Sequence, residues 1–162
     1  MEAIKLDKCL KNTEQGAQNA ITNIQSIHKP ALGKTSGVAL FCSKVSAGFP
    51  SPADDYMEGK LDLNEYLVKQ PAATFFVRCT GDSMINAGIA EGDILVVDRS
   101  LTPISGKIVV AVLNGELTVK RLYKHEEYLE LLPENPNYHP IRVNKEHDFM
   151  VWGVVTSVIH KV

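Results

Sequence analysis

Two residues of this 162-residue chain have types and surroundings that could support nucleophilic chemistry, and the first is Ser83. It lies in Gly81-Asp82-Ser83-Met84, directly after an aromatic and β-branched run. A serine in such a turn can share its loop with backbone N–H groups, so one loop would supply a nucleophile and the donors for an oxyanion. The segment does not match GxSxG, and serine is common in turns. On residue type alone, an ordinary turn serine fits the pattern as well.

The second residue is Lys120, which lies in a segment with the pattern of a strand. Strand alternation places Lys120 on the same face as Thr118 and Leu122, with Leu117 and Val119 on the other face. A lysine beside apolar neighbours loses hydration, which lowers its pKa and favours the neutral amine that a general base needs. A strand lysine that reaches water fits the same residues, so both alternatives stay open on these facts.

The elements that must position these two residues have the pattern of a small antiparallel β domain. Asn114-Gly115 between two apolar segments is a strong hairpin signal. Asp62 with Glu65 three residues later predicts a capped short helix that ends near Lys69, before Pro71. The predicted strands are 74–79, 94–98, 107–113, 116–123, 128–132, 141–143 and 149–159. Short strands at close spacing predict a mostly β, compact antiparallel fold with one short helix.

The first part of the chain, residues 1–47, has few structural signals. Ile21, Ile24 and Ile27 are spaced by three, which predicts a weak amphipathic helix before Pro30. We expect the segment to be a flexible N-terminal arm. The junction at 45–52 combines small residues with Gly48 and two prolines, and is expected to be extended and accessible. A plain linker is the alternative for that junction.

Composition excludes several classes of protein. The longest apolar run is far shorter than the roughly 18 to 20 residues of a membrane span, and no segment has the pattern of a signal peptide. Three cysteines without a CxxC pair, and scattered histidines, predict neither a disulfide framework nor a metal site. No P-loop or GxGxxG is present, so no cofactor is expected. We expect a cytoplasmic protein that has no membrane partner.

Charge divides the chain at the same junction. Residues 1–47 carry six lysines and three acids, whereas residues 48–162 carry eleven basic and sixteen acidic side chains. The acidic balance of the main part argues against broad phosphate binding. A helix-turn-helix module needs about three helices and a basic face. Direct DNA binding is therefore not expected, although the basic arm leaves contact with nucleic acid or an acidic partner open.

Several separated segments, in order, resemble the LexA/UmuD family of self-cleaving Ser-Lys peptidases. The resemblance covers about residues 42–162 and includes both candidate residues. The similar segments are 47–56 (AGFPSPADDY), 81–85 (GDSMI), 92–98 (GDILVVD), 115–120 (GELTVK), 133–138 (PENPNY) and 151–155 (VWGVV).

The resemblance implies a role for each matching residue. Ser83 would be the nucleophile, and Lys120 the neutral general base that takes its proton. The backbone N–H groups of Asp82 and Ser83 would hold the oxyanion, and the scissile bond would be Ala47–Gly48. Residues 1–47 would then be a cleavable arm, laid over its own or a partner's active site. Residues 48–162 would be the Ser-Lys peptidase and dimerisation domain, of the LexA/signal-peptidase-like fold type.

The resemblance also implies partners and a process. Members similar to this chain form homodimers and cleave themselves when stimulated by a RecA filament on single-stranded DNA. The processed form then joins a Y-family DNA polymerase subunit of the UmuC type, in error-prone translesion synthesis during the SOS response.

Three other functions remain to be weighed. A LexA-like transcriptional repressor of DNA-damage genes, inactivated by self-cleavage, would bind an operator only as the intact chain. A signal-peptidase-like enzyme would share the Ser-Lys chemistry, but the chain has no apolar anchor segment. A β-domain interaction module would keep its processing unchanged in Ser83→Ala and Lys120→Ala variants.

Overall fold

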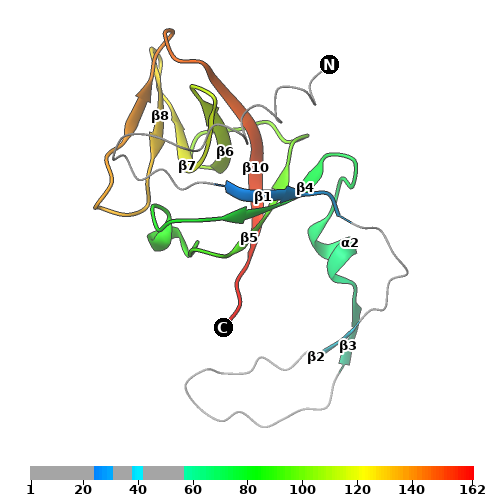
Figure 1. Cartoon of the computed structure of the whole chain (residues 1–162). Coiled ribbons are helices and arrows are strands. Elements are labelled where there is room, and N and C mark those ends of the chain that lie inside the picture. The colour runs from blue at the N-terminus through cyan, green and yellow to red at the C-terminus, as the bar shows by residue number, and fades with distance from the viewer. Residues whose placement is uncertain (1–23, 31–37, 42–56) are drawn as a thin grey trace.

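The computed structural model describes residues 24–30, 38–41 and 57–162. Strands β1 (Ile24–His28), β2 (Val38–Phe41) and β3 (Met57–Leu61) come first and are followed by helix α2 (Leu63–Leu67) (Figure 1). The remaining elements are β4 (Thr74–Cys79), the 3-10 turn η1 (Ile85–Ala87), β5 (Ile94–Asp98), β6 (Ile108–Leu113), β7 (Glu116–Lys124), β8 (Leu129–Leu132), β9 (Ile141–Val143) and β10 (Phe149–Ile159).

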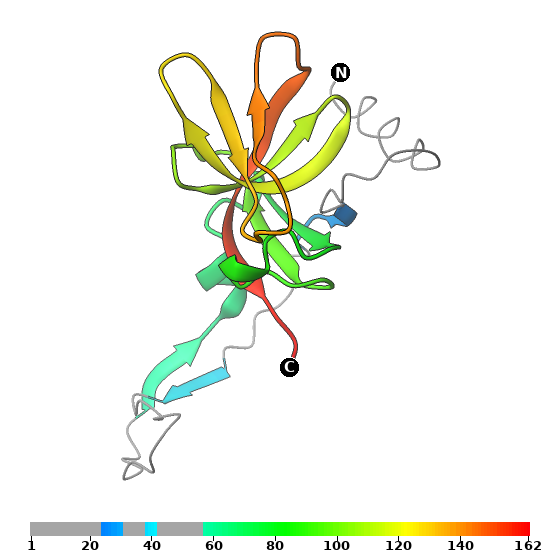
Figure 2. The ribbon, with the colours of Figure 1, turned by 90° about the vertical axis from the view of Figure 1, so that its left-hand side faces the viewer.

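Eight strands form one antiparallel sheet in the order β1-β4-β5-β10-β6-β7-β8-β9. Figures 1 and 2 show that the sheet is curled, with the long strand β10 passing through its middle. The register of β10 shifts between Val151 and Gly153 and again between Val155 and Ser157. Such bulges bend a strand and increase its twist, which suits a strand that serves both halves of a curled sheet. The predicted mostly β, antiparallel fold is confirmed.

The local signals in the sequence give most of these elements. The strands at 74–79, 94–98, 141–143 and 149–159 have the predicted bounds, and the other three differ by one residue. Asn114 and Gly115 form the predicted hairpin turn, with φ values of 51° and 86°. Two successive positive φ values match the twist of the flanking strands, which explains the Asn-Gly pair.

The short helix is also confirmed, although it ends at Leu67 and not near Lys69. The Asp62 side chain accepts hydrogen bonds from the backbone N–H groups of Asn64 and Glu65 and so caps the helix. The helix ends where the backbone N–H of Val68 closes onto the carbonyl of Asn64. The side chain of Val68 is buried there.

The helix expected around Ile24 and Ile27 is wrong, because these residues lie in β1, at the edge of the sheet. A register shift between Ile24 and Ser26 places Ile24 opposite Cys79 and Ile27 opposite Val77. Because Cys79 and Val77 are two residues apart, the two isoleucines lie on the same face of the sheet. A bulged strand therefore produces the spacing of three that resembles a helix.

The apolar residues form two buried groups. The first core contains Val77, Cys79, Met84, Ile89, Leu95, Val97, Val110, Val119 and Trp152. The second core contains Val109, Ala111, Leu122, Leu131, Val143 and Val154. Alternate residues of β6 and β7 belong to different cores, so the middle of the sheet is apolar on both faces. Any polar side chain that points inward there is removed from water.

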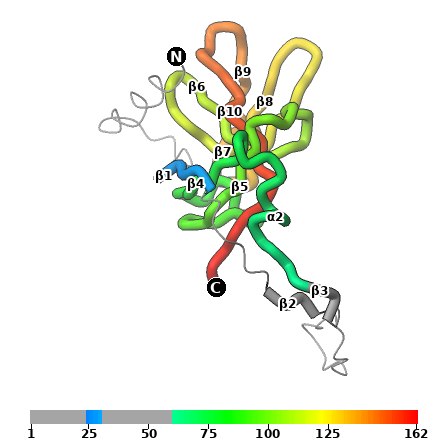
Figure 3. Tube along the Cα trace, turned by 90° about the vertical axis from the view of Figure 1, so that its right-hand side faces the viewer, coloured from blue at the N-terminus to red at the C-terminus, as the bar shows by residue number. Residues whose placement is uncertain are grey.

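Strands β2 and β3 form a separate two-stranded antiparallel sheet. Figures 1 and 2 agree that this pair lies beyond α2, away from strands β6 and β7. Figure 3 shows that strand β1, in contrast, lies beside β4 of the main sheet. Neither β2 nor β3 is among the strands that the sequence predicts. Among the described residues, no helix is both long and apolar enough to cross a membrane.

Candidate active site

The two candidate residues meet inside the domain. The Nζ atom of Lys120 donates a hydrogen bond of 2.8 Å to the Oγ atom of Ser83. Ser83 follows β4, and Lys120 lies in the middle of β7. Both side chains are buried, with exposed fractions of 0% and 3%. A serine hydroxyl and a lysine amine therefore lie in direct contact and away from water.

Strand alternation explains why Lys120 points inward. As predicted, Lys120 shares its face of β7 with Thr118 and Leu122, and Leu122 belongs to the second core. Across the β6–β7 pair, Lys120 lies opposite Val109, which belongs to the same core. This apolar surrounding is the cause of the lost hydration.

Burial lowers the pKa of Lys120 from 10.5 to about 8. None of the ion pairs among the described residues involves this lysine, so no carboxylate there restores the charged form. Two further acceptors surround the amine, Thr118 Oγ1 at 3.1 Å and the carbonyl of Val119 at 3.0 Å. A neutral amine has two N–H groups and one lone pair. The ammonium form donates its third N–H group to Ser83. The neutral form can still donate to Thr118 and Val119 while its lone pair receives the proton of the Ser83 hydroxyl.

The loop that carries Ser83 has a fixed shape. Gly81 has a φ of 81°, in the left-handed region where glycine is favoured, so the chain can turn sharply after β4. The side chains of Met84 and Ile89 are fully buried in the first core and anchor the loop. A backbone hydrogen bond of 3.1 Å from Ile85 N–H to the carbonyl of Asp82 closes the turn around the serine.

A second loop, residues 133–138, braces the serine loop. The backbone N–H of Glu134 donates to the carbonyl of Ser83 at 2.8 Å. The Nδ2 atom of the buried Asn135 donates to the carbonyl and to the Oδ2 atom of Asp82, both at 3.1 Å. The hydroxyl of Tyr138 donates to the Oδ1 atom of Asp82, and this bond raises the pKa of Tyr138. The two residues that were expected to hold an oxyanion are thus fixed from outside their own loop.

Arg121 connects this brace to the strand of the lysine. It pairs with Glu134 and also donates to the carbonyl of Gly106 at 2.7 Å. Because Arg121 follows Lys120 directly, the ion pair holds the bracing loop close to β7. Serine, lysine and brace therefore form one hydrogen-bonded assembly.

The structure places the expected residues as follows. Ser83 and Lys120 lie together, as expected, and the backbone of Asp82 lies in the braced loop. Ala47 and Gly48 lie outside the described residues. The oxyanion role of the Asp82 and Ser83 N–H groups stays a prediction. No group of three or more possible metal ligands is found among the described residues.

Sequence reasoning gave no role to Thr118, Asn135 and Tyr138. Thr118 shares a strand face with Lys120, and this position could have identified it as a partner of the amine. Asn135 lies 53 residues from Asp82 in the chain, and Tyr138 lies 56 residues from it. Residues 133–138 are one of the segments that resemble the LexA/UmuD family, but the resemblance assigns no role to either side chain.

The domain is a curled antiparallel sheet, and its buried serine–lysine pair is one of the nucleophile–base combinations that serine-type peptidases use. Residues 39–156 match the family described as Peptidase S24-like, and the chain belongs to this family. This range covers both members of the pair, most of β2 and β10, and all of the strands from β3 to β9.

The chain is similar over most of its length to several curated proteins. It is 48% identical to Protein SamA of Salmonella typhimurium over 126 residues, which cover 78% of this chain and 87% of the relative. It is 47% identical to Protein ImpA of Escherichia coli over 138 residues, which cover 83% of this chain and 93% of the relative. It is also 43% identical to the LexA repressor of Acidithiobacillus ferrooxidans over 119 residues, which cover 72% of this chain and 58% of the repressor.

Proposed function

We propose that this chain is an SOS mutagenesis protein that cleaves its own Ala47–Gly48 bond with Ser83 and Lys120. The observation that carries the proposal is the 2.8 Å contact between the amine and the hydroxyl at a buried site. Membership of a serine peptidase family supports it.

The first half of the reaction follows from this contact. Ser83 Oγ forms a bond to the carbonyl carbon of Ala47 while its proton moves to the neutral Lys120 Nζ. The carbonyl oxygen becomes an oxyanion, which the backbone N–H groups of Asp82 and Ser83 stabilise. The carbon–nitrogen bond to Gly48 then breaks, and the lysine ammonium gives its proton to the departing amine. An ester between Ser83 and Ala47 remains.

Water completes the reaction. A water molecule loses a proton to the neutral Lys120 and attacks the ester carbonyl. The ester bond breaks, and Ser83 Oγ recovers its proton from the lysine. The products are a chain that ends at Ala47 and a chain that begins at Gly48, and the enzyme groups return to their starting state.

The burial of the pair favours a tethered substrate. A serine with an exposed fraction of 0% is poorly placed to meet proteins that diffuse freely. A segment of the same chain, or of a second copy in a homodimer, arrives with a high effective concentration. A RecA filament on single-stranded DNA would then act by favouring the docked state of the arm. The processed form would assist a Y-family DNA polymerase of the UmuC type in the cytoplasm.

The repressor alternative is supported by the 43% identity to a LexA repressor, but the identities of 48% to SamA and 47% to ImpA favour the first proposal. The chain covers 87% and 93% of SamA and ImpA but only 58% of the LexA repressor. Binding of the intact chain to operator DNA, lost on cleavage, would favour the repressor.

The test is the intact mass of the full chain before and after incubation with RecA, single-stranded DNA and a nucleotide analogue. New masses that match residues 1–47 and 48–162, absent in Ser83→Ala and Lys120→Ala, are expected. Gly48→Glu, which adds bulk and charge at the scissile bond, should remain intact. Normal cleavage of Gly48→Glu would mean that the bond lies elsewhere, and cleavage of Ser83→Ala would exclude the nucleophile.

A further inference from the structure

We propose that residues 1–47 stay bound to residues 48–162 after the Ala47–Gly48 bond is cut, so that the processed protein is a nicked, two-chain molecule. The inference rests on the proposed function, because self-cleavage is the event that would produce the two chains. The binding surface is the β4 edge of the sheet, and the segment that occupies it is β1 of the same chain.

The predicted bond lies between strands that pair across it. Strand β1 precedes the bond and pairs with β4, which follows it. Strand β2 also precedes the bond and pairs with β3, which follows it. The first fragment would therefore contain β1 and β2, and the second fragment would contain both of their partners. Cutting the backbone between β2 and β3 removes a tether and leaves both pairings unchanged.

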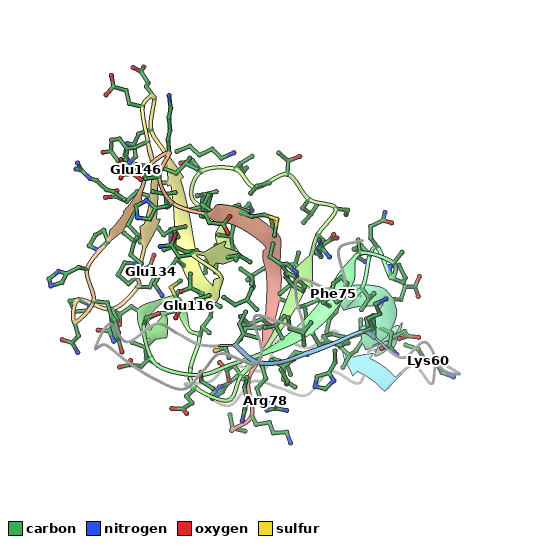
Figure 4. All side chains as sticks on the ribbon, turned by 45° about the horizontal axis from the view of Figure 1, so that its top comes forward. Lys60, Phe75, Arg78, Glu116, Glu134 and Glu146 are labelled. Atoms are coloured by element: carbon green, nitrogen blue, oxygen red, sulfur yellow. The ribbon has the colours of Figure 1, made fainter. Side chains whose placement is uncertain are left out.

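The contacts of β1 are those of an integral strand. Figure 4 shows β1 alongside the strand that carries Arg78, and Arg78 lies opposite Ser26 in the register. Ile24 and Ile27 lie on one face and pack against the first core. Their direct partners in the register, Cys79 and Val77, are fully buried. Apolar burial of this kind is the main favourable term in the association of protein surfaces.

Release of β1 would expose surface that the domain otherwise covers. Strand β1 is the first strand of the sheet, so its loss would leave the N–H and carbonyl groups of β4 unpaired along an open edge. Because the sheet is curled, β1 also approaches β7, the strand of Lys120. Loss of β1 would therefore uncover part of the first core, against which Ile24 and Ile27 pack.

Charge supports the same conclusion. The first fragment carries six lysines and three acids, and the second carries eleven basic and sixteen acidic side chains. Fragments of opposite net charge attract each other, and salt screens this attraction. We expect the two-chain molecule to be held by apolar packing and strand pairing, with a contribution from charge that falls at high salt.

The experiment separates retention from self-cleavage. In the first experiment, the wild-type full chain cleaves itself with RecA filament or in alkaline buffer. In the second experiment, the Ser83→Ala full chain carries the recognition sequence of a site-specific protease between Ala47 and Gly48 and is cut by that protease. Both products are then examined by size-exclusion chromatography and native mass spectrometry at micromolar concentration, with and without urea.

The expected result is one particle that contains both fragments in native buffer and separates in urea. Release of the first fragment in native buffer in the second experiment would overturn the proposal. If the wild-type chain does not cleave itself in the first experiment, this result counts against the proposed function alone. The second experiment does not need Lys120 or Ser83.

Matched variants test the role of β1. Ile27→Asp places a charge against the first core and should release the fragment after cutting, whereas Gln25→Asp places the same charge on an exposed position of the same strand and should retain it. Ile27→Ala keeps the intact chain folded and should weaken fragment binding by about tenfold or more. Equal retention in Ile27→Ala, Ile27→Asp and Gln25→Asp would show that β1 packing does not hold the fragment.

Discussion

Thr118 Oγ1 lies 3.1 Å from Lys120 Nζ on the same face of the same strand, and its side chain is almost fully buried. The threonine therefore accepts one N–H group of the amine, which leaves the lone pair of the neutral form available to the Ser83 hydroxyl. A buried amine without this acceptor would lose a fixed orientation and an N–H partner at once.

We therefore expect Thr118→Val to slow self-cleavage by about fivefold even in alkaline buffer, because one lost hydrogen bond is worth roughly 1 kcal/mol. The measurement is the single-turnover rate of cleavage, followed by the amount of intact chain over time. Thr118→Ser keeps the hydroxyl and should recover most of the rate. Equal rates for the valine and serine variants would exclude a positioning role.

The pH dependence of cleavage follows from the pKa of Lys120, which burial lowers to about 8. Only the neutral amine accepts a proton, so the rate without RecA should rise about tenfold per pH unit below 8 and level off above it. The rate of cleavage across buffers from pH 6 to pH 10 checks this, with Ser83→Ala as the blank. A rate that is constant across this range would contradict the role of the lysine as a base.

Burial of the same amine also makes the stability of the domain depend on pH. The pKa of Lys120 is lower in the folded state than in the unfolded state, so its penalty is fully present below pH 8 and is relieved as pH rises toward 10.5. Relative to Lys120→Met, the wild-type domain should gain about 2 to 3 kcal/mol of unfolding free energy between pH 7 and pH 10. Urea unfolding of both proteins at the two pH values measures this gain.

The comparison with Lys120→Met removes the contributions of other groups. Burial raises the pKa of Cys79 from 9.0 to about 11, so this thiol lowers stability as pH rises above 9 in both proteins. The difference between wild type and variant cancels that contribution. An unchanged difference between pH 7 and pH 10 would mean that Lys120 keeps its ordinary pKa in the folded domain.

Asn135 is expected to act on the rate of cleavage through the serine loop. Asn135→Ala removes both hydrogen bonds to Asp82 and should slow cleavage by about tenfold or more, since each such bond is worth roughly 1 kcal/mol. Asn137→Ala changes an exposed asparagine in the same loop and should leave the rate unchanged. Circular dichroism of both variants confirms that each is folded. If both variants cleave at the wild-type rate, the brace does not position the nucleophile.

The sequence predicts those parts of the fold that depend on near neighbours. Alternating apolar residues and the Asn114-Gly115 turn define the central hairpin, because the signal and the structure involve the same few residues. The spacing of Ile24 and Ile27 predicts a helix and is wrong, because a bulge whose position depends on the partner strand changes the spacing.

The site shows the same division between local and distant information. Strand alternation alone correctly placed Thr118 on the face of Lys120. The contact between Lys120 and Ser83 joins residues 37 positions apart, and it was expected only from a family resemblance. The hydrogen bonds of Asn135 to Asp82 span 53 positions, and no periodicity in the sequence indicates them.

The central place of β10 has a consequence for the order in which the protein can mature during synthesis. In the eight-stranded sheet, β1, β4 and β5 lie on one side of β10, and β6 to β9 lie on the other. The serine loop follows β4, and Lys120 belongs to β7, so β10, which is synthesised after both of them, joins the two halves. We expect a nascent chain to hold its nucleophile and its base apart until residues 149–159 have emerged, which protects the growing polypeptide from premature cleavage.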